Sequence, residues 1–132
     1  MNVVLLHTNG DEETVQISDL EEMQALVGGY IEMLRAASAD YCMVINEEGK
    51  LKNLPINEIA TAMAREDFLI FPNDVVVGNV FFCKVSRKTG EFVGLNTRSR
   101  VIILGRIARI RNVINVYFQN RFYKIVEEIQ GG

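Results

Sequence analysis

The C-terminal third of the chain constrains the fold most strongly, because residues 96–130 contain no proline and repeat apolar residues at intervals of three or four. Such intervals keep side chains on one face of an α-helix, whereas the strict alternation of a strand fails over residues 99–111. We therefore predict that this segment is helical, as two helices that break near Asn112 or at residues 119–120. A strand at residues 101–104 is the alternative, because β-branched residues favour strands. The apolar face consists of Ile103, Ile107, Ile110, Ile114, Tyr117, Phe118, Phe122, Ile125 and Ile129.

Charge is distributed unevenly along the chain. Residues 1–94 carry 7 Lys and Arg against 15 Asp and Glu, a balance of −8, whereas residues 95–132 carry 7 against 2, a balance of +5. The two balances add up to the formal charge of −3. This asymmetry is typical of a site for an anionic ligand, or of opposite charges that neutralise one another within an oligomer. The basic segment contains the closely spaced Arg98, Arg100, Arg106, Arg109 and Arg111.

The acidic body, residues 1–94, has the pattern of a β-rich fold. A capping box formed by Ser18 and Glu21 begins one predicted helix, which ends at Gly28 and Gly29. A second helix is predicted at residues 56–64, and Gly78 predicts a bulge or the close approach of another backbone. Apolar and β-branched runs predict strands at residues 2–8, 14–17, 30–34, 41–45, 67–71 and 74–85, with a hairpin between the first two and a bend at 37–40.

The length and the apolar content set the number of domains, and the order of the predicted elements sets the class of fold. A chain of 132 residues, 48% of them hydrophobic, fits one domain that covers residues 1–132 and buries a core. We predict the α+β class, with a small mixed or antiparallel β core, short helices and a basic C-terminal helical segment at residues 95–132.

No pattern in the sequence predicts catalysis, a metal site or a cofactor. His7 is the only histidine, and no serine or cysteine in a nucleophile context lies near it. The carboxylates at residues 11–13 and 47–48 fall in expected turns, where solvation explains them. Cys42 and Cys83 are isolated in strand-like segments and are expected to be buried thiols. Because these residues form no recognisable catalytic pattern, we predict a non-enzymatic protein. We predict that it is cytoplasmic, because the cysteines are expected to be reduced and no signal peptide or membrane-spanning run is recognisable.

The arginines indicate an interface between subunits. On an ideal helix Arg98 and Arg109 lie within about 20° of each other, and Arg106 lies about 60° from Arg109. The rest of the circumference is largely apolar, which fits a helix that packs against its own domain and against a second subunit. Three interpretations stay open. The arginines pair with the acidic body across a homo-oligomer interface, or they line a pocket for a phosphorylated nucleotide, or they bind nucleic acid. The sequence pI of about 5.2 disfavours the third.

A nucleotide pocket would combine guanidinium groups for the phosphates with an aromatic ring for the base. Phe81 and Phe82 are adjacent in a predicted strand and therefore face opposite sides of the sheet. One belongs to the core, and the other is covered by the C-terminal helix, by a partner or by a ligand. The predicted ligand-binding residues are Arg98, Arg106 and Arg109 for the phosphates, Phe82 (or Phe81) for the base, and Asn96 and Thr97 for base and ribose.

Three blocks of the sequence occur in an order that resembles a known family. The blocks are LEEMQALVGGYIEML, VINEEGKLKNLPINEIATAMA and DVVVGNVFF. Together they resemble an uncharacterised domain family carried by bacteriophages and mobile elements, over roughly residues 14–83. The resemblance implies a phage or plasmid origin. In architecture, a β-rich core with C-terminal helices is similar to the Thoeris anti-defence sponge proteins, which bind cyclic ADP-ribose-type immune signals between subunits without cleaving them.

We therefore expect a phage-encoded anti-defence protein that sequesters a phosphorylated nucleotide of the cyclic ADP-ribose type as a homo-oligomer. Arginines would replace the hydration of the phosphates, and an aromatic face would cover the base. The alternative is a protein-binding inhibitor of a restriction or CRISPR nuclease. Such an inhibitor would use the acidic surface of the body to imitate nucleic-acid phosphates.

Overall fold

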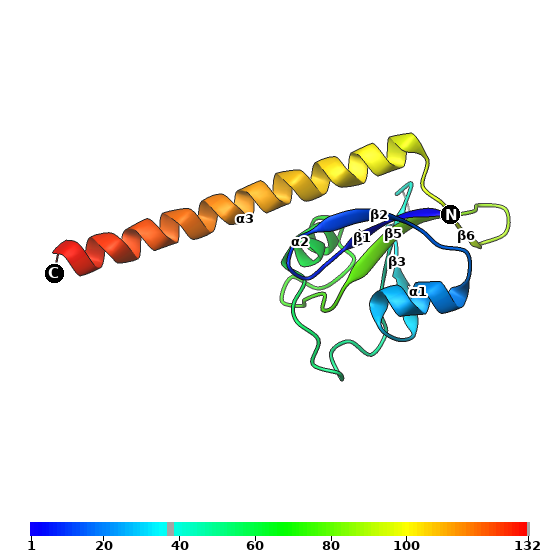
Figure 1. Cartoon of the computed structure of the whole chain (residues 1–132), viewed down its shortest axis with the longest axis horizontal. Coiled ribbons are helices and arrows are strands. Elements are labelled where there is room, and N and C mark those ends of the chain that lie inside the picture. Colours follow the sequence, from blue (N-terminus) through cyan, green and yellow to red (C-terminus); the bar gives the residue numbers. More distant parts are fainter. Residues whose placement is uncertain (37–38, 132) are drawn as a thin grey trace.

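The computed structural model describes residues 1–36 and 39–131. A six-stranded antiparallel sheet carries α1 on one face and both α2 and α3 on the other, so the fold is α+β as predicted (Figure 1). The bend predicted at residues 37–40 falls partly outside the described residues. The elements are β1 (Asn2–Leu6), β2 (Glu12–Gln16), α1 (Leu20–Val27), β3 (Ile31–Leu34), β4 (Cys42–Asn46), α2 (Glu58–Glu66), β5 (Val80–Val85), β6 (Phe92–Val93) and α3 (Thr97–Gly131).

The sheet has the strand order β2-β1-β5-β4-β3, and β6 pairs with β5. The predicted N-terminal hairpin is confirmed, with Val3 opposite Val15. Every pairing is antiparallel, which decides between the mixed and antiparallel alternatives. Strands β2 and β3 form the two ends of this order, so each has one side that no strand of the described chain covers.

The adjacent phenylalanines of β5 bury their rings in two separate cores. Phe82 is fully buried against Ile103 and Ile107 of α3, together with residues of α2. Phe81 is fully buried on the opposite face against Met23 of α1. The alternation of side chains along β5 produces this division. The C-terminal helix therefore covers Phe82. The sequence left three possibilities for this covering element: the C-terminal helix, a partner or a ligand.

The short helices begin one or two residues later than predicted. Asp19 rather than Ser18 is the N-cap of α1, because its carboxylate accepts a hydrogen bond from the backbone N–H of Glu22 at 2.9 Å. The predicted stop is confirmed, since Gly28 ends α1 with a left-handed φ of 80°. Asn57 caps α2 by accepting from the backbone N–H of Ala60 at 3.1 Å.

The segment between α2 and β5 differs most from the prediction. Residues 67–71 were predicted as a strand, but Phe68 has a φ of 56°, which no strand contains. Of the strand predicted at residues 74–85, only Val80–Val85 forms. The backbone approach predicted for Gly78 is confirmed, because its N–H donates to the carbonyl oxygen of Pro55 at 2.7 Å. Its φ is 80°, and an added Cβ would also lie 2.8 Å from the side-chain Cδ1 of Leu54.

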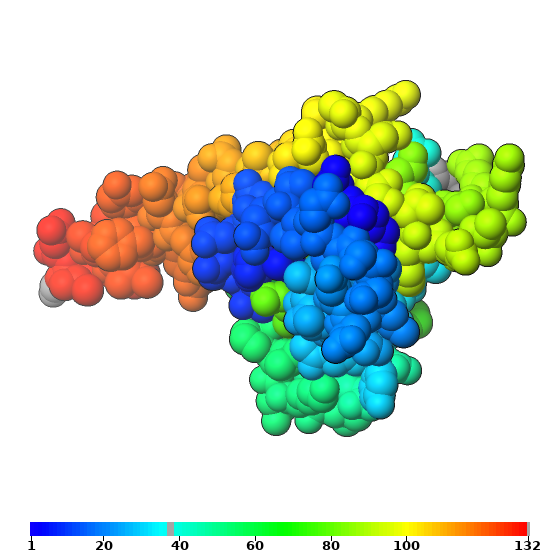
Figure 2. Space-filling view, turned by 45° about the vertical axis from the view of Figure 1, so that its right-hand side comes forward, coloured from blue at the N-terminus to red at the C-terminus, as the bar shows by residue number. Residues whose placement is uncertain are grey.

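The C-terminal segment is one continuous helix, α3, so both the predicted break and the alternative strand at residues 101–104 are wrong. Asparagine and glutamine lower helix stability by less than about 0.7 kcal/mol each, which does not interrupt a helix that already has many turns. The first half of α3 packs on the body, and the second half extends past it into solvent (Figures 1 and 2). We refer to residues 97–112 as the proximal half and residues 113–131 as the distal half.

Candidate functional site

Arg106 is held in a cluster of side chains from the C-terminal end of α2 and from Tyr41, the residue before β4. Its guanidinium donates to Asp67 at 2.8 and 3.1 Å, to Glu66 at 2.9 Å and to the hydroxyl of Tyr41 at 2.6 Å. The side chain is only 20% exposed. Partial burial disfavours the charged guanidinium, but the hydrogen bonds to Asp67 and Glu66 outweigh it and raise the pKa of Arg106. The group is therefore a permanent cation whose donors are used within the chain.

Two further arginines of α3 also bind acidic groups of the body. Arg109 donates to both oxygens of Glu66, at 2.9 and 3.0 Å. Arg111 pairs with Glu12 and donates to the carbonyl oxygen of Gly10 at 2.5 Å. The hydrogen bond from Arg106, with that from Arg109, lowers the pKa of Glu66 below its ordinary value. Ion pairing of the arginines with the acidic body thus occurs within one chain, whereas the sequence-based interpretation placed it between subunits.

The structure does not bring the six predicted ligand-binding residues to one cavity. Arg106 and Arg109 meet at Glu66, as described above. Asn96, Thr97 and Arg98 are exposed at the start of α3, and Arg98 lies about 12 Å along the helix axis from Arg106. Phe82 is fully buried in the core, so its ring offers no surface for a base.

The distal half of α3 carries several exposed apolar side chains, spaced three or four residues apart. The apolar face that is buried at Ile103, Ile107 and Ile110 continues past the edge of the body. It leaves Phe118 53% and Ile129 76% exposed, with Phe122 and Ile125 between them. Figure 2 shows this part of the helix projecting from the body. The 3.6-residue period that predicted the helix also predicted this face, but not where the body would end.

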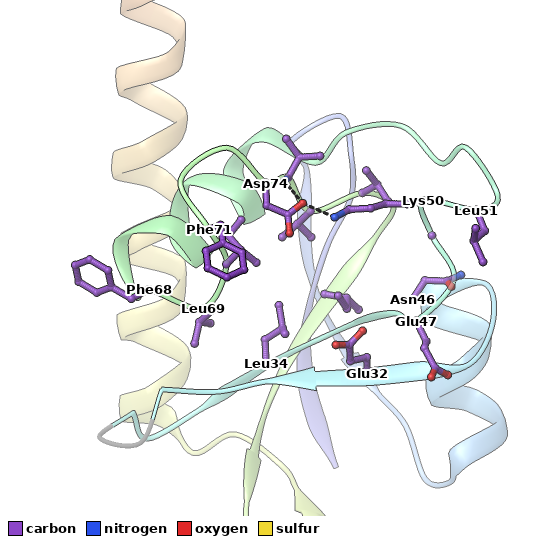
Figure 3. A pocket seen from close by; sticks show the side chains of 16 residues that line it. Glu32, Leu34, Asn46, Glu47, Lys50, Leu51, Phe68, Leu69, Phe71 and Asp74 are labelled. Carbon is purple, nitrogen blue, oxygen red and sulfur yellow. Dashed lines mark hydrogen bonds and ion pairs between the residues drawn. The ribbon is translucent and has the colours of Figure 1, made fainter.

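An open cavity of about 410 Å³ lies beside β3, under the segment that connects α2 to β5 (Figure 3). Glu32 and Leu34 of β3 point into it, and Leu69 and Phe71 border it from the connecting segment. Phe68 lies at its outer rim, with its ring directed away from Glu32 and Leu34. Lys50 and Asp74 form an ion pair across its upper side. The hydrogen bond from Lys50 lowers the pKa of Asp74, which therefore stays ionised near neutral pH.

Sequence reasoning missed this cavity. Its charged residues come from three segments that are distant in the sequence, and Glu47 was interpreted as an ordinary solvated turn residue. The available signal was the DFLIF run at residues 67–71, whose two phenylalanines were assigned to a strand. A strand would alternate buried and exposed residues, whereas Phe68 and Phe71 are both exposed.

The groups with catalytic potential are engaged in ordinary contacts. His7 hydrogen-bonds through Nε2 to Glu13 at 3.0 Å. Cys42 and Cys83 are buried free thiols on neighbouring strands, 3.5 Å apart, as expected from the sequence. The hydrogen bond with Cys42 and burial both raise the pKa of Cys83, which therefore stays a protonated thiol. In residues 1–36 and 39–131, no three His, Cys, Asp or Glu side chains are grouped to hold a metal ion.

Comparison with known proteins identifies the family. A family model described as a domain of unknown function, DUF3846, matches residues 1–107, and the chain belongs to this family. The sequence-based resemblance to an uncharacterised family is confirmed at this level. The matched residues end within α3, so the distal half lies outside the match. No curated protein and no solved structure matches the chain. Across the described part of the chain, no helix has the length and apolar content to span a membrane.

Proposed function

We propose that the protein is a non-enzymatic binding protein that acts as a homodimer joined through the distal half of α3. The observation that carries the proposal is the continuation of one apolar face from the core into solvent. On an ideal helix, Phe118, Phe122, Ile125 and Ile129 lie within about 60° of one another. A helix face of this kind in water is stabilised by a second helix that buries it.

Charge favours an antiparallel pair of two identical helices. The distal half carries Arg121 and Lys124 before Glu127 and Glu128, a net charge of zero (two basic minus two acidic). In a parallel pair, like charges would lie at the same level. In an antiparallel pair with Phe118 opposite Ile129 and Phe122 opposite Ile125, Arg121 lies within about 3 Å, measured along the axis, of the level of Glu128 of the second copy. The helix is therefore complementary to itself in this orientation.

The body then supplies the surface that meets a target. Its balance of −8 is only partly neutralised by the arginines of α3, so a basic protein surface is the complementary partner. If the chain has the phage origin that the resemblance implies, a restriction or CRISPR nuclease is such a partner, because it binds nucleic acid through basic residues. This is the protein-contact alternative of the sequence-based hypothesis.

Sequestration of a cyclic ADP-ribose-type nucleotide stays a prediction. It requires phosphates to displace Glu66 and Asp67 from Arg106 and Arg109, with loss of the hydrogen bonds described above. A melting-temperature screen with cyclic ADP-ribose isomers tests it directly. A rise in melting temperature that Arg109→Ala removes, in a protein that stays oligomeric, would establish nucleotide binding and replace the protein-contact proposal.

Light scattering on purified protein tests the dimer. The wild-type chain should have twice the mass of the 14.9 kDa monomer, and Phe118→Glu should give the monomer because it places a charge on the apolar face. The matched control is Val116→Glu, because Val116 is 47% exposed against 53% for Phe118 but lies on the opposite side of α3. Glutamate favours helix more than either residue it replaces, so helix loss does not explain a difference. A monomeric wild-type protein contradicts the proposal.

A further inference from the structure

The cavity beside β3 combines an open sheet edge, acidic side chains and exposed aromatic rings. We propose that β3 and this cavity bind an extended segment of a partner protein, in which a Lys or Arg side chain lies two positions from an apolar one. The proposal rests on the proposed function in one respect, namely that the partner is a protein. It does not depend on α3.

The backbone of β3 is arranged to accept another strand. The N–H of Glu47 donates to the carbonyl of Tyr30 at 2.8 Å, and hydrogen-bonded pairs alternate along an antiparallel ladder. The next hydrogen-bonded pair is therefore Glu32 with Ile45, and the backbone groups of Ile31 and Met33 are directed away from β4. Among the described residues, no strand pairs with this outer side of β3. An extended segment can add here by main-chain hydrogen bonds.

The charge of the cavity favours a cation. Three acidic side chains and one basic side chain line it, a net charge of −2, and Lys50 is already paired with Asp74. Glu32 points into the cavity next to Leu34 and Ile45, and it forms no ion pair within the described residues (Figure 3). A carboxylate beside apolar side chains suits Lys or Arg, whose aliphatic stem packs while its charged end meets the carboxylate.

The rim of the cavity carries a phenylalanine where glycine is favoured. Leu69 N donates to the carbonyl of Ala64 at 2.8 Å, and Phe68 has a φ of 56°, which is the geometry of a Schellman cap at the end of α2. A bulky residue is strained in this conformation, and Phe68 is 92% exposed, so it gains nothing from burial in its own fold. A contact with another molecule explains an aromatic side chain that the described residues leave exposed and whose backbone conformation is unfavourable.

The spacing of these features predicts the sequence of the bound segment. In an added strand, the side chains opposite Glu32 and opposite Leu34 lie on the cavity face and are two residues apart. The first meets a carboxylate, and the second meets the apolar end of the cavity at Leu69 and Phe71 (Figure 3). A basic residue and an apolar residue separated by one position therefore match the site.

Nuclear magnetic resonance titration tests the proposal with a defined probe. The probe is the acetylated, amidated peptide Thr-Lys-Thr-Val-Thr-Lys-Thr-Val-Thr, added to the full-length ¹⁵N-labelled protein. It should shift the amide signals of residues 31–34 and 68–71. One control peptide carries Glu in place of Lys, and another has N-methylated backbone amides. The peptide with Glu should bind at least about tenfold more weakly, the effect of losing one charge-assisted hydrogen bond. The N-methylated peptide should also bind at least about tenfold more weakly, because it loses several main-chain hydrogen bonds to β3 at once.

Variants of the protein complete the test. Glu32→Gln should weaken binding of the peptide at least about tenfold, whereas Glu21→Gln on α1, an exposed carboxylate outside the cavity, should not. Phe68→Gly should weaken binding while raising the melting temperature by about 2–8 °C, because it removes the strain. No shift at residues 31–34, equal binding by Glu32→Gln, or equal binding of the N-methylated peptide would overturn the proposal. Light scattering on the same samples separates this failure from failure of the dimer.

Discussion

The two halves of α3 share one helical pattern but differ in what surrounds them. In the proximal half, the apolar face lies on the sheet and on α2, and Ile103 and Ile107 have no exposed surface. In the distal half, the same face continues at Phe118, Phe122 and Ile125, where the described residues leave it exposed. The charges also differ. Three proximal arginines, Arg106, Arg109 and Arg111, are bound by body carboxylates, whereas the distal charges of both signs balance within one short segment.

The contrast shows that having an apolar helix face and burying that face are two separate properties. The 3.6-residue period determines that a helix has an apolar face, and it does so equally in both halves. Whether that face is buried depends on the size of the body, which the period does not encode. An apolar face that continues beyond its own core is typical of a surface that contacts another molecule. We infer from this contrast that the proximal half stabilises the fold and the distal half joins two copies.

The largest expected difference between the halves is in stability. Ile107→Ala should lower the free energy of unfolding by about 2–5 kcal/mol, because it leaves a cavity in a fully buried site. Ile129→Ala should change it by less than about 0.5 kcal/mol, because the residue is exposed in the monomer. Urea unfolding measures both, in a chain kept monomeric by Phe118→Glu. Equal losses at the two positions would show that the distal half folds back onto the body.

A smaller effect is expected from the ion pairs of the proximal half. Arg106→Met should lower the free energy of unfolding by about 1–3 kcal/mol, because Asp67 and Glu66 lose a partly buried partner. Arg98→Met is the matched control, since Arg98 is exposed at the start of the same helix, and its effect should stay within about 0.5 kcal/mol. If both substitutions are neutral, the cluster around Arg106 does not hold α3 to the body.

The smallest effect is a pH dependence that Glu66 causes. Hydrogen bonds from Arg106 and Arg109 lower its pKa below the ordinary 4.5, so the unfolded chain binds the proton more readily than the folded one. The stabilisation is complete above pH 4.5 and is lost as the pH falls through the lowered folded pKa. Thermal unfolding between pH 7 and pH 3 should show a shallower decline in Arg106→Met than in the wild type. Parallel curves would mean that these arginines do not stabilise the ionised form.

Local sequence signals predicted much of the body correctly. The hairpin, the stop at Gly28 and the close approach at Gly78 each depend on turn or glycine chemistry within a few residues. The continuous α3 was missed because Asn112 and Gln119 were treated as breaks, although each costs a helix little in its interior. The loop around Phe68 was missed because a phenylalanine with positive φ contradicts every local preference.

The candidate sites were less accessible to sequence reasoning than the fold. The excess of arginine in α3 was recognised, but its partners Glu66 and Asp67 lie about 40 residues away in the sequence, and only the packing of α2 on α3 brings them together. The cavity beside β3 similarly requires the positions of three separate segments. Both the ion pairs of Arg106 and the cavity depend on contacts between residues that are distant in the sequence, which a local sequence pattern does not contain.

Disulfide trapping of the distal half tests the central claim most directly. In the proposed antiparallel pair, residue 118 of one copy faces residue 129 of the other, whereas the two copies of residue 118 are separated by about 16 Å along the axis. The double variant Phe118→Cys/Ile129→Cys should therefore form a covalent dimer under mild oxidation, and neither single variant should. A covalent dimer from both single variants would indicate a parallel pair. If the double variant stays a monomer, the exposed face of α3 is not covered by a second copy.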